Sequence, residues 1–196
     1  AGACAATAVV WWVVASRPSV PAAAGESPAG VPATALPQPS ETAEPASDAG
    51  AAEQAGDVHE LLSSSSSTRS SLSDAIASAS GCHRSGVDTI EDITANRRDQ
   101  LAAARTLDVT ALPGGPELKR TLVDALDASY DADTAFLSWA RRYLAGGCKG
   151  PVSDDRDYRR GISRSEAAQA AKSQFARSWR PIAETHGLTA WKANQI

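Results

Sequence analysis

The feature that most constrains the fold is an apolar repeat at helical spacing that runs from Leu118 to Leu144. Its members return every three or four positions, so on a helix they form one continuous stripe. They are Leu118, Leu122, Val123, Leu126, Tyr130, Phe136, Leu137, Ala140 and Leu144. The pattern predicts one long helix, and we expect it to be the central hydrophobic element of the fold.

Three further stretches have the same period, over residues 57–80, about 87–104 and about 153–186. Glycine-containing connections separate them, at Gly81, around Pro113 and at Gly146. Only 5% of the residues are aromatic, which favours close-packed helices. Short connections between helices of similar length favour antiparallel neighbours. We therefore predict an all-α fold, an antiparallel up-down-up-down four-helix bundle over residues 57–190, with residues 191–196 as a C-terminal tail.

The N-terminal part of the chain differs from the rest. Residues 1–16 begin with an uncharged apolar run that would cover roughly 22 Å as a helix, against the roughly 30 Å of a membrane interior. We expect a partial transmembrane anchor here, and the absence of Met agrees with a chain that begins inside its own membrane segment. A cleaved signal segment and a lipoprotein site at Cys4 are the alternatives.

Residues 17–56 are rich in proline and alanine, and seven of the 11 prolines lie between Pro18 and Pro45. Such a composition buries too little apolar surface to offset the entropy of ordering. The sequence therefore predicts a disordered linker between the anchor and the bundle.

The net charge of the chain lies in its N-terminal part. Residues 1–56 hold one Arg and five acidic residues, whereas residues 57–196 hold 18 basic and 18 acidic residues. Because binding to nucleic acid depends on neutralising phosphates, this balance predicts no nucleic-acid partner. The sequence has no phosphate-binding glycine loop and no dinucleotide fingerprint, so we expect no cofactor.

Two cysteines, Cys82 and Cys148, each follow a glycine that is expected to end a helix. In the predicted bundle, the connections after the first and third helices lie at the same end, so the two thiols are positioned to form a disulfide. Such a bond contributes about 4 kcal/mol in the chain-entropy model and requires an oxidising compartment. Free thiols are one alternative. A metal site using Cys82, His83 and Cys148 is another, but it lacks a fourth ligand, so we expect no metal.

Charged residues fall on or beside the apolar stripes at one level. Three of them lie about 20 Å along their helices from the cysteine end: Arg69, Arg97 and Asp133. We predict a polar layer in the middle of the bundle, joined from the fourth helix by Glu166 or Gln169. The layer has two interpretations. It is either a set of salt bridges that fixes helix register, or a site for a small anion or carboxylate, because two Arg face one Asp.

Other candidates for chemistry are weaker, and we predict no catalytic residues. Asp57 and His59 precede a serine run, but no strand or nucleophile elbow presents a serine to them. The aromatic residues Trp139, Tyr143 and Trp179 are typical of a core or a groove rather than of a ligand cage.

Several local sequences in the last 140 residues or so are shared with one group of proteins. They are Ser67-Thr68-Arg69 with Leu72, Cys82, Leu112-Pro113-Gly114-Gly115 with Leu118, the segment Asp131–Ala140, Cys148, Phe175, Trp179-Arg180-Pro181-Ile182-Ala183 and Gly187-Leu188. In these features the chain resembles a family of uncharacterised actinobacterial membrane-anchored or secreted proteins. The resemblance implies an envelope location and a two-cysteine bundle, and it brings no known activity.

Together these observations predict a non-enzymatic extracytoplasmic domain for envelope interaction or ligand sensing. The expected partners are the membrane, through the N-terminal segment, and an envelope protein or a small-molecule ligand. We expect a single-pass protein of the cell membrane with its C-terminal domain outside the cytoplasm, or alternatively a secreted protein. An envelope enzyme that uses the polar layer and a structural subunit of a membrane complex are the alternative functions.

Overall fold

The computed structural model describes residues 45–66 and 69–196, and the side chains of residues 48–64 and 71–196. The expected anchor, residues 1–16, and residues 17–44 of the expected linker lie outside the described residues. Among the described helices, none is long and apolar enough to cross a membrane.

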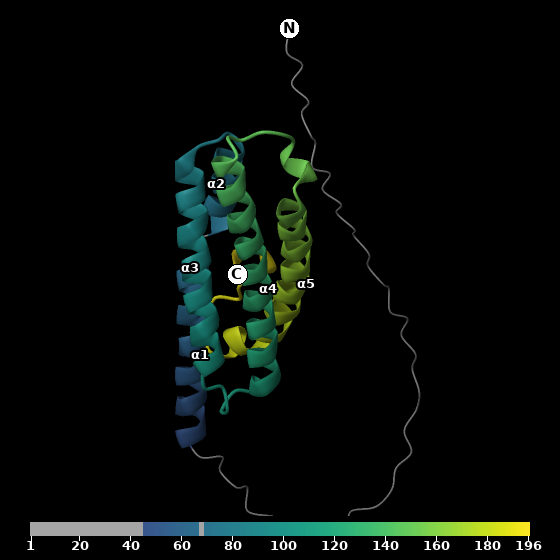
Figure 1. Cartoon of the computed structure of the whole chain (residues 1–196). Coiled ribbons are helices and arrows are strands. Elements are labelled where there is room, and N and C mark those ends of the chain that lie inside the picture. The colour runs from purple at the N-terminus through teal and green to yellow at the C-terminus, as the bar shows by residue number, and fades with distance from the viewer. Residues whose placement is uncertain (1–44, 67–68) are drawn as a thin grey trace, which may run out of the picture. The chain divides into compact units, whose positions relative to one another are not determined.

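The described part of the chain is all-helical and contains five α-helices and no strand, which confirms the predicted all-α class (Figure 1). Neighbouring helices in the sequence pack together along α2, α3, α4 and α5. The helices are α1 (Pro45–Ser66), α2 (Arg69–Ser80), α3 (Arg84–Thr106), α4 (Gly115–Ala145) and α5 (Arg156–Thr185), with short 3-10 turns η1 (Val152–Asp154) and η2 (Ala193–Gln195).

The start of the first helix corrects the predicted boundary at residue 57. Residues 45–56, which we assigned to the linker, belong to α1. Within them Ala51 and Ala55 are buried against the same core as Val58 and Leu62. Alanines diluted among polar residues resemble a spacer in composition, but at helical spacing they form a packing stripe.

The expected first helix, over residues 57–80, falls on two described helices, and residues 67–68 between them lie outside the described residues. α1 ends within the serine run, at Ser66, and α2 begins at Arg69. Near this end the hydroxyl of Ser63 donates to the carbonyl of His59 at 2.9 Å, and that of Ser64 to the carbonyl of Leu61 at 2.8 Å. Serine side chains compete in this way for backbone groups, which weakens a helix.

Two apolar clusters fill the interior, and we name them the lower core and the upper core after their places in Figure 1. α4 contributes to both. The lower core includes Val58, Leu62, Leu101, Leu118, Leu122, Leu126, Phe175, Trp179 and Ile182. The upper core includes Ala75, Ala79, Val87, Ile90, Phe136, Leu137, Trp139 and Ala140.

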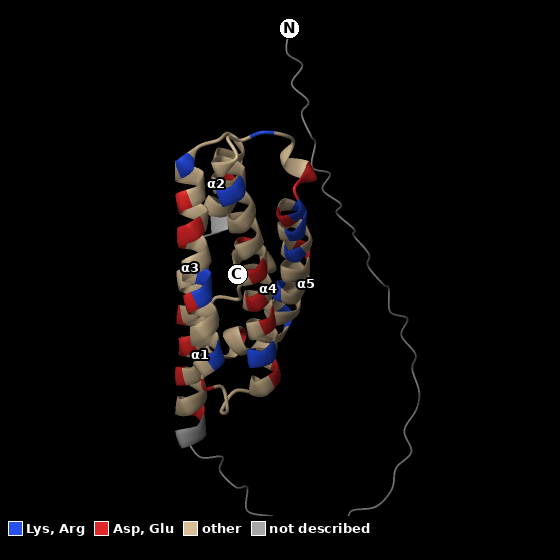
Figure 2. Ribbon diagram, viewed as in Figure 1, with Lys and Arg blue, Asp and Glu red and all other residues tan. Residues whose placement is uncertain are grey.

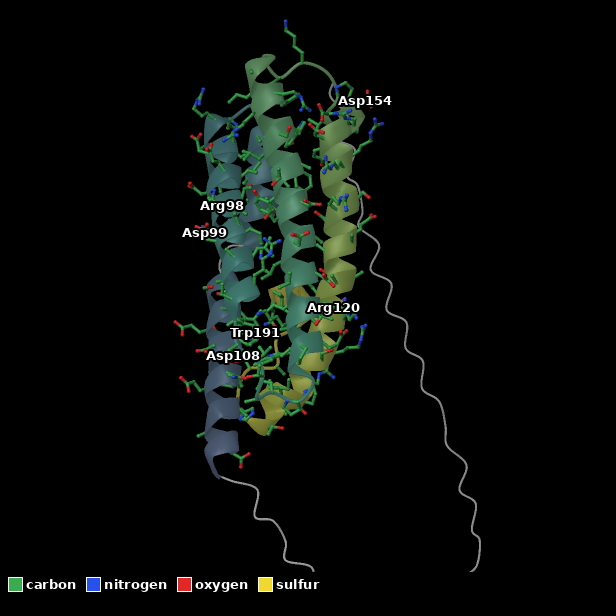
Figure 3. The ribbon with its side chains drawn as sticks, turned by 60° about the horizontal axis from the view of Figure 1, so that its bottom comes forward. Arg98, Asp99, Asp108, Arg120, Asp154 and Trp191 are labelled. Atoms are coloured by element: carbon green, nitrogen blue, oxygen red, sulfur yellow. A yellow bond between two sulfur atoms is a disulfide. The ribbon has the colours of Figure 1, made fainter. Side chains whose placement is uncertain are left out.

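The last residues of the chain pack on the lower core, so the prediction of a C-terminal tail over residues 191–196 is wrong. Ile196 is fully buried there. The indole nitrogen of Trp191, labelled in Figure 3, donates to Nδ1 of His59 in α1 at 3.1 Å. The indole of Trp179 donates to the carbonyl of Thr189 at 2.9 Å. These contacts fold the segment after α5 back over α1 and the lower core.

The predicted disulfide between Cys82 and Cys148 is present, with the two Cα atoms 5.8 Å apart. It joins the turn between α2 and α3 to the connection between α4 and α5. Both cysteines have left-handed backbone conformations, with φ of 66° at Cys82 and 58° at Cys148. At the end of α2 the Cys82 and His83 amides bond back to the carbonyls of Ala79 and Ser78, the pattern of a Schellman cap.

Glycine is the usual residue at such a cap, and Gly81 was predicted to end the helix. The left-handed position is instead taken by Cys82. A residue with a Cβ is disfavoured in this conformation by roughly 1–2 kcal/mol. The disulfide therefore holds a backbone conformation that the cysteine itself disfavours.

This conformation predicts different effects for two substitutions at position 82. We compare Cys82→Ser/Cys148→Ser with Cys82→Gly/Cys148→Ser, which remove the same disulfide. The glycine variant is expected to be more stable by roughly 1 kcal/mol, because only glycine adopts the left-handed conformation without steric penalty. Urea unfolding of both variants measures the difference, and equal free energies of unfolding would contradict it.

Close to the disulfide, Gly86 brings the backbones of α2 and α3 together. A Cβ at this position would lie 2.4 Å from the amide nitrogen of Ala79 and 2.6 Å from the carbonyl oxygen of Ala75. Both are backbone atoms, so a side chain has no room unless the helices separate. Gly56 in α1 has no atom within 4 Å of the same position.

The two glycines therefore predict opposite effects of alanine. Gly86→Ala is expected to lower the free energy of unfolding by roughly 2 kcal/mol through overpacking. Gly56→Ala is expected to raise it by up to about 1 kcal/mol, because alanine has the higher helix propensity. Thermal or urea unfolding measures both, and a neutral Gly86→Ala would show that α2 and α3 are free to move apart.

Candidate functional site

A polar layer lies between the lower and upper cores. It contains Arg97 from α3, Asp133 from α4 and Lys172 from α5, which are 4%, 2% and 3% exposed. The Nε atom of Arg97 lies 3.5 Å from Oδ2 of Asp133, and Nη1 of Arg97 donates to Gln100 at 3.2 Å. The ion pair thus links α3 to α4 inside the bundle.

The structure agrees with part of the predicted layer. It brings Arg97 and Asp133 together as expected. Arg69 starts α2, but its side chain lies outside the described residues. Glu166 and Gln169, which were expected to join the layer from the fourth helix, are both exposed.

The charged residue that α5 contributes is Lys172, which the sequence analysis missed. A signal for it exists, because Lys172 falls four residues after Ala168 and three before Phe175, both of them buried. It therefore occupies the buried stripe of α5. Its position on the stripe does not by itself predict burial, because a lysine is almost never fully buried unless it is paired.

A cavity of about 70 Å³ opens among these side chains. Among the described residues, its polar lining includes the three charged residues together with Ser129 and Ser165. The hydroxyl of Ser129 donates to the carbonyl of Ala125 at 2.8 Å, within its own helix. The apolar lining comes from Leu72, Ile93, Ala132 and Ala168.

The described lining carries two positive side chains and one negative side chain. Burial of a charge in an apolar interior is costly unless an opposite charge compensates it. Arg97 and Asp133 form an ion pair within this lining, and Lys172 is also engaged in an interaction. The volume of about 70 Å³ limits any occupant of the cavity to a small molecule.

The aromatic residues singled out from the sequence lie in separate places. Trp139 is buried in the upper core and Trp179 in the lower core, so they do not form one cage. Tyr143 packs on Trp139, with ring centroids 5.8 Å apart. These residues are packing elements, in agreement with the preferred interpretation.

His59, one of the possible serine-hydrolase residues, is engaged with the C-terminal segment. Nδ1 of His59 accepts the indole hydrogen bond of Trp191, and Asp57 is exposed. Within the described part of the chain, no group of three or more His, Cys, Asp or Glu side chains is placed to hold a metal ion.

Charge is distributed unevenly over the helices (Figure 2). α1 contains four acidic residues and no Lys or Arg, whereas α5 contains seven basic and three acidic residues. The balanced total of residues 57–196 thus conceals an acidic helix and a basic helix.

A second group of charges lies at the disulfide end, where Arg142 of α4 meets the start of α5. Nη2 of Arg142 lies 3.0 Å from both carboxylate oxygens of Asp155, and Nη1 forms a bond with Asp157. Asp155 also caps α5, accepting from the amides of Asp157 and Tyr158. Hydrogen bonds from Arg142 and then Ser138 lower the pKa of Asp157. This group fixes the start of α5 and does not line the cavity.

The lowered pKa predicts how stability depends on pH. A carboxylate with a depressed pKa in the folded state stabilises the fold above the unfolded value, near 3.8, and this contribution is lost as the pH falls below it. Arg142→Met is expected to reduce the loss of stability between about pH 4 and 2. Urea unfolding across this range measures the effect, with Arg98→Met, at an exposed pair, as the control. Parallel pH profiles for Arg142→Met and the parent would contradict the prediction.

Comparison of the sequence and structure with known proteins identified no similar protein. No family model matches the chain, and neither a curated protein nor a solved structure is significantly similar to it.

Proposed function

We propose that the described domain is a non-enzymatic module of the cell envelope that senses a small ligand. The observation that carries the proposal is the cavity between two apolar cores, lined by Arg97, Asp133 and Lys172. Apolar packing at these positions would stabilise a bundle as well as or better than buried charges do. The presence of three charged groups around a cavity therefore supports a role in binding.

The arrangement supports binding rather than catalysis. General acid–base catalysis needs a group within hydrogen-bond reach of the proton that it moves. The guanidinium of Arg97 and the carboxylate of Asp133 instead lie beside each other, 3.5 Å apart. Groups placed in this way hold one another and attract charge, which suits a ligand site.

The disulfide supports a location outside the cytoplasm, because disulfides persist in oxidising compartments. In the proposed arrangement, residues 1–16 belong to a single transmembrane span and residues 17–44 form a disordered spacer. A secreted form is the alternative. The family resemblance noted above supports the same location.

The proposed architecture is an up-down-up-down four-helix bundle in which α1 and α2 together occupy the position of the first helix. The packing of α3 between α2 and α4, and of α4 against α5, supports it. The disulfide supports it as well, because it joins the ends of α2 and α4.

A purely structural role for the layer has one observation in its favour. The ion pair of Arg97 and Asp133 joins α3 to α4, and such a pair can fix the register of two helices. The binding role and the structural role predict different results when the three charged residues are replaced by apolar ones.

The proposal predicts the behaviour of the triple variant Arg97→Met/Asp133→Leu/Lys172→Met. We expect it to fold with a stability at least equal to that of the parent, because apolar replacements of buried charges are often neutral or stabilising. The parent purified from its producing cells should retain a small molecule, detected by native mass spectrometry, and the variant should retain none.

The matched control is Arg98→Met/Asp99→Leu/Lys149→Met, at exposed positions, of which Arg98 and Asp99 project outward from α3 (Figure 3). It should retain the same molecule as the parent. A parent that retains nothing, together with a buried triple variant that loses its single folded state, would assign the layer to structure alone.

A further inference from the structure

The end of the domain that carries the disulfide presents a group of exposed basic side chains. Two helices begin at this end, α3 shortly after Cys82 and α5 shortly after Cys148. Lys and Arg residues lie at the start of α3, on the connection after α4 and along the start of α5 (Figure 2). We name this group the upper basic surface, and its members, all exposed, are Arg84, Lys149, Arg156, Arg159 and Arg160.

The carboxylates near this surface are in part already bound. Asp155 and Asp157, at the start of α5, both accept hydrogen bonds from Arg142 of α4. Two other carboxylates at this end, Asp88 and Asp154, are exposed. Positive side chains therefore outnumber negative ones at the end of the bundle.

Local stability does not account for the positions of these basic residues. Arg84 and Arg156 are the first residues of α3 and α5, where the positive end of the helix dipole disfavours a cation. Arg159 and Arg160 follow Arg156 on the same side of α5, and like charges three or four positions apart repel each other. Within the described residues, the one ion pair of this surface joins Arg156 to the adjacent Asp157 at 3.9 Å, with the Arg156 side chain 91% exposed. A negatively charged partner would relieve both unfavourable effects.

The placement of the basic residues indicates the form of that partner. They come from two helices and from the connection between α4 and α5, so they are spread over the end of the bundle. A small anion contacts only the groups around one point, whereas an extended anionic surface contacts all of them. Four of the five residues are arginines, and a guanidinium group binds phosphate oxygens through two parallel hydrogen bonds.

An exposed apolar side chain adjoins the upper basic surface. Ile162 lies one helical turn after Arg159, and it is the only large apolar side chain that is exposed in the described part of the chain, at 44%. Glu166, a further turn along α5, is exposed and limits the surface to the start of the helix. A lipid bilayer offers anionic headgroups beside hydrocarbon, which matches both parts of the surface. A nucleic acid or a soluble phosphate polymer matches only the basic part.

We propose that the upper basic surface docks on a membrane that contains anionic phospholipids. The arginines bind the headgroup phosphates, and Ile162 lies at the boundary with the acyl chains. This contact is separate from the cavity between the two cores, and it does not depend on the function proposed above. It places the disulfide end of the domain against the lipid.

The test measures the partition of the full chain onto vesicles by flotation. One set of vesicles is phosphatidylcholine, and the other is equal parts of phosphatidylcholine and phosphatidylglycerol. Residues 1–16 carry no acidic or basic side chain except Ala1's amino terminus, so binding through them is expected on both sets. The partition coefficient should be at least tenfold higher on the anionic vesicles, and high salt should remove this excess by screening.

Removal of the α5 arginines should remove the preference for anionic lipid. Arg156→Gln/Arg159→Gln/Arg160→Gln should lower partition onto the anionic vesicles at least tenfold, because each basic residue near an anionic surface contributes roughly fivefold. Partition onto phosphatidylcholine should stay unchanged. Arg84→Gln/Lys149→Gln, outside α5, should lower anionic partition at least fivefold, which keeps the test valid if the triple variant disturbs the start of α5.

The matched control removes the same charge from other exposed positions. Arg98→Gln/Arg105→Gln/Arg120→Gln changes residues of α3 and of the start of α4, and Arg98 and Arg120 are labelled in Figure 3. It should change anionic partition less than twofold. Equal effects of the control and of the α5 triple variant would show that net charge alone governs binding, and would overturn the proposed surface.

Ile162→Ser separates a lipid surface from a soluble polyanion. It should lower partition onto the anionic vesicles about threefold and leave binding to soluble polyphosphate unchanged. Equal partition of the parent onto both sets of vesicles would overturn the proposal. If polyphosphate binds through the same arginines and Ile162→Ser does not affect vesicle binding, the partner is a soluble polyanion and the proposed lipid contact is wrong.

Discussion

Three charged side chains, Arg97, Asp133 and Lys172, lie together between two apolar cores, and the cost of burying their charges constrains how α3, α4 and α5 pack. Asp133 has to lie beside Arg97, since either charge alone would be buried without compensation. Lys172 reaches the same level from α5, where the lower core gives way to the upper core. A shift of one helix along another would place a charge in one of the apolar cores.

The two ends of the domain are held by different means. At the upper end, the disulfide and the ion pairs of Arg142 fix the turns around α2, α4 and α5. At the lower end, the segment after α5 packs over α1, with Trp191 on His59 and Ile196 in the core. The polar layer lies between them, so both ends restrain the helices that position it.

The sequence predicted those features that depend on local pattern or on counting along a helix. The long helix α4 was identified because its apolar repeat is continuous. The level of Arg97 and Asp133, and the pairing of Cys82 with Cys148, followed from the distances along helices in antiparallel order. The start of α1 at Pro45 was missed, because its buried Ala51 and Ala55 resemble a linker in composition.

The sequence by itself determined the helical class, the cysteine pair and the level of the charged layer, because each depends on a fixed rise and period of the helix. Only the tertiary structure decided which face of α5 is buried, and hence that Lys172 lines the cavity while Glu166 stays exposed. It also decided that residues 191–196 belong to the core. The physical reason is that burial depends on neighbours distant in the sequence, and a polar residue at a stripe position is buried only where those neighbours compensate its charge.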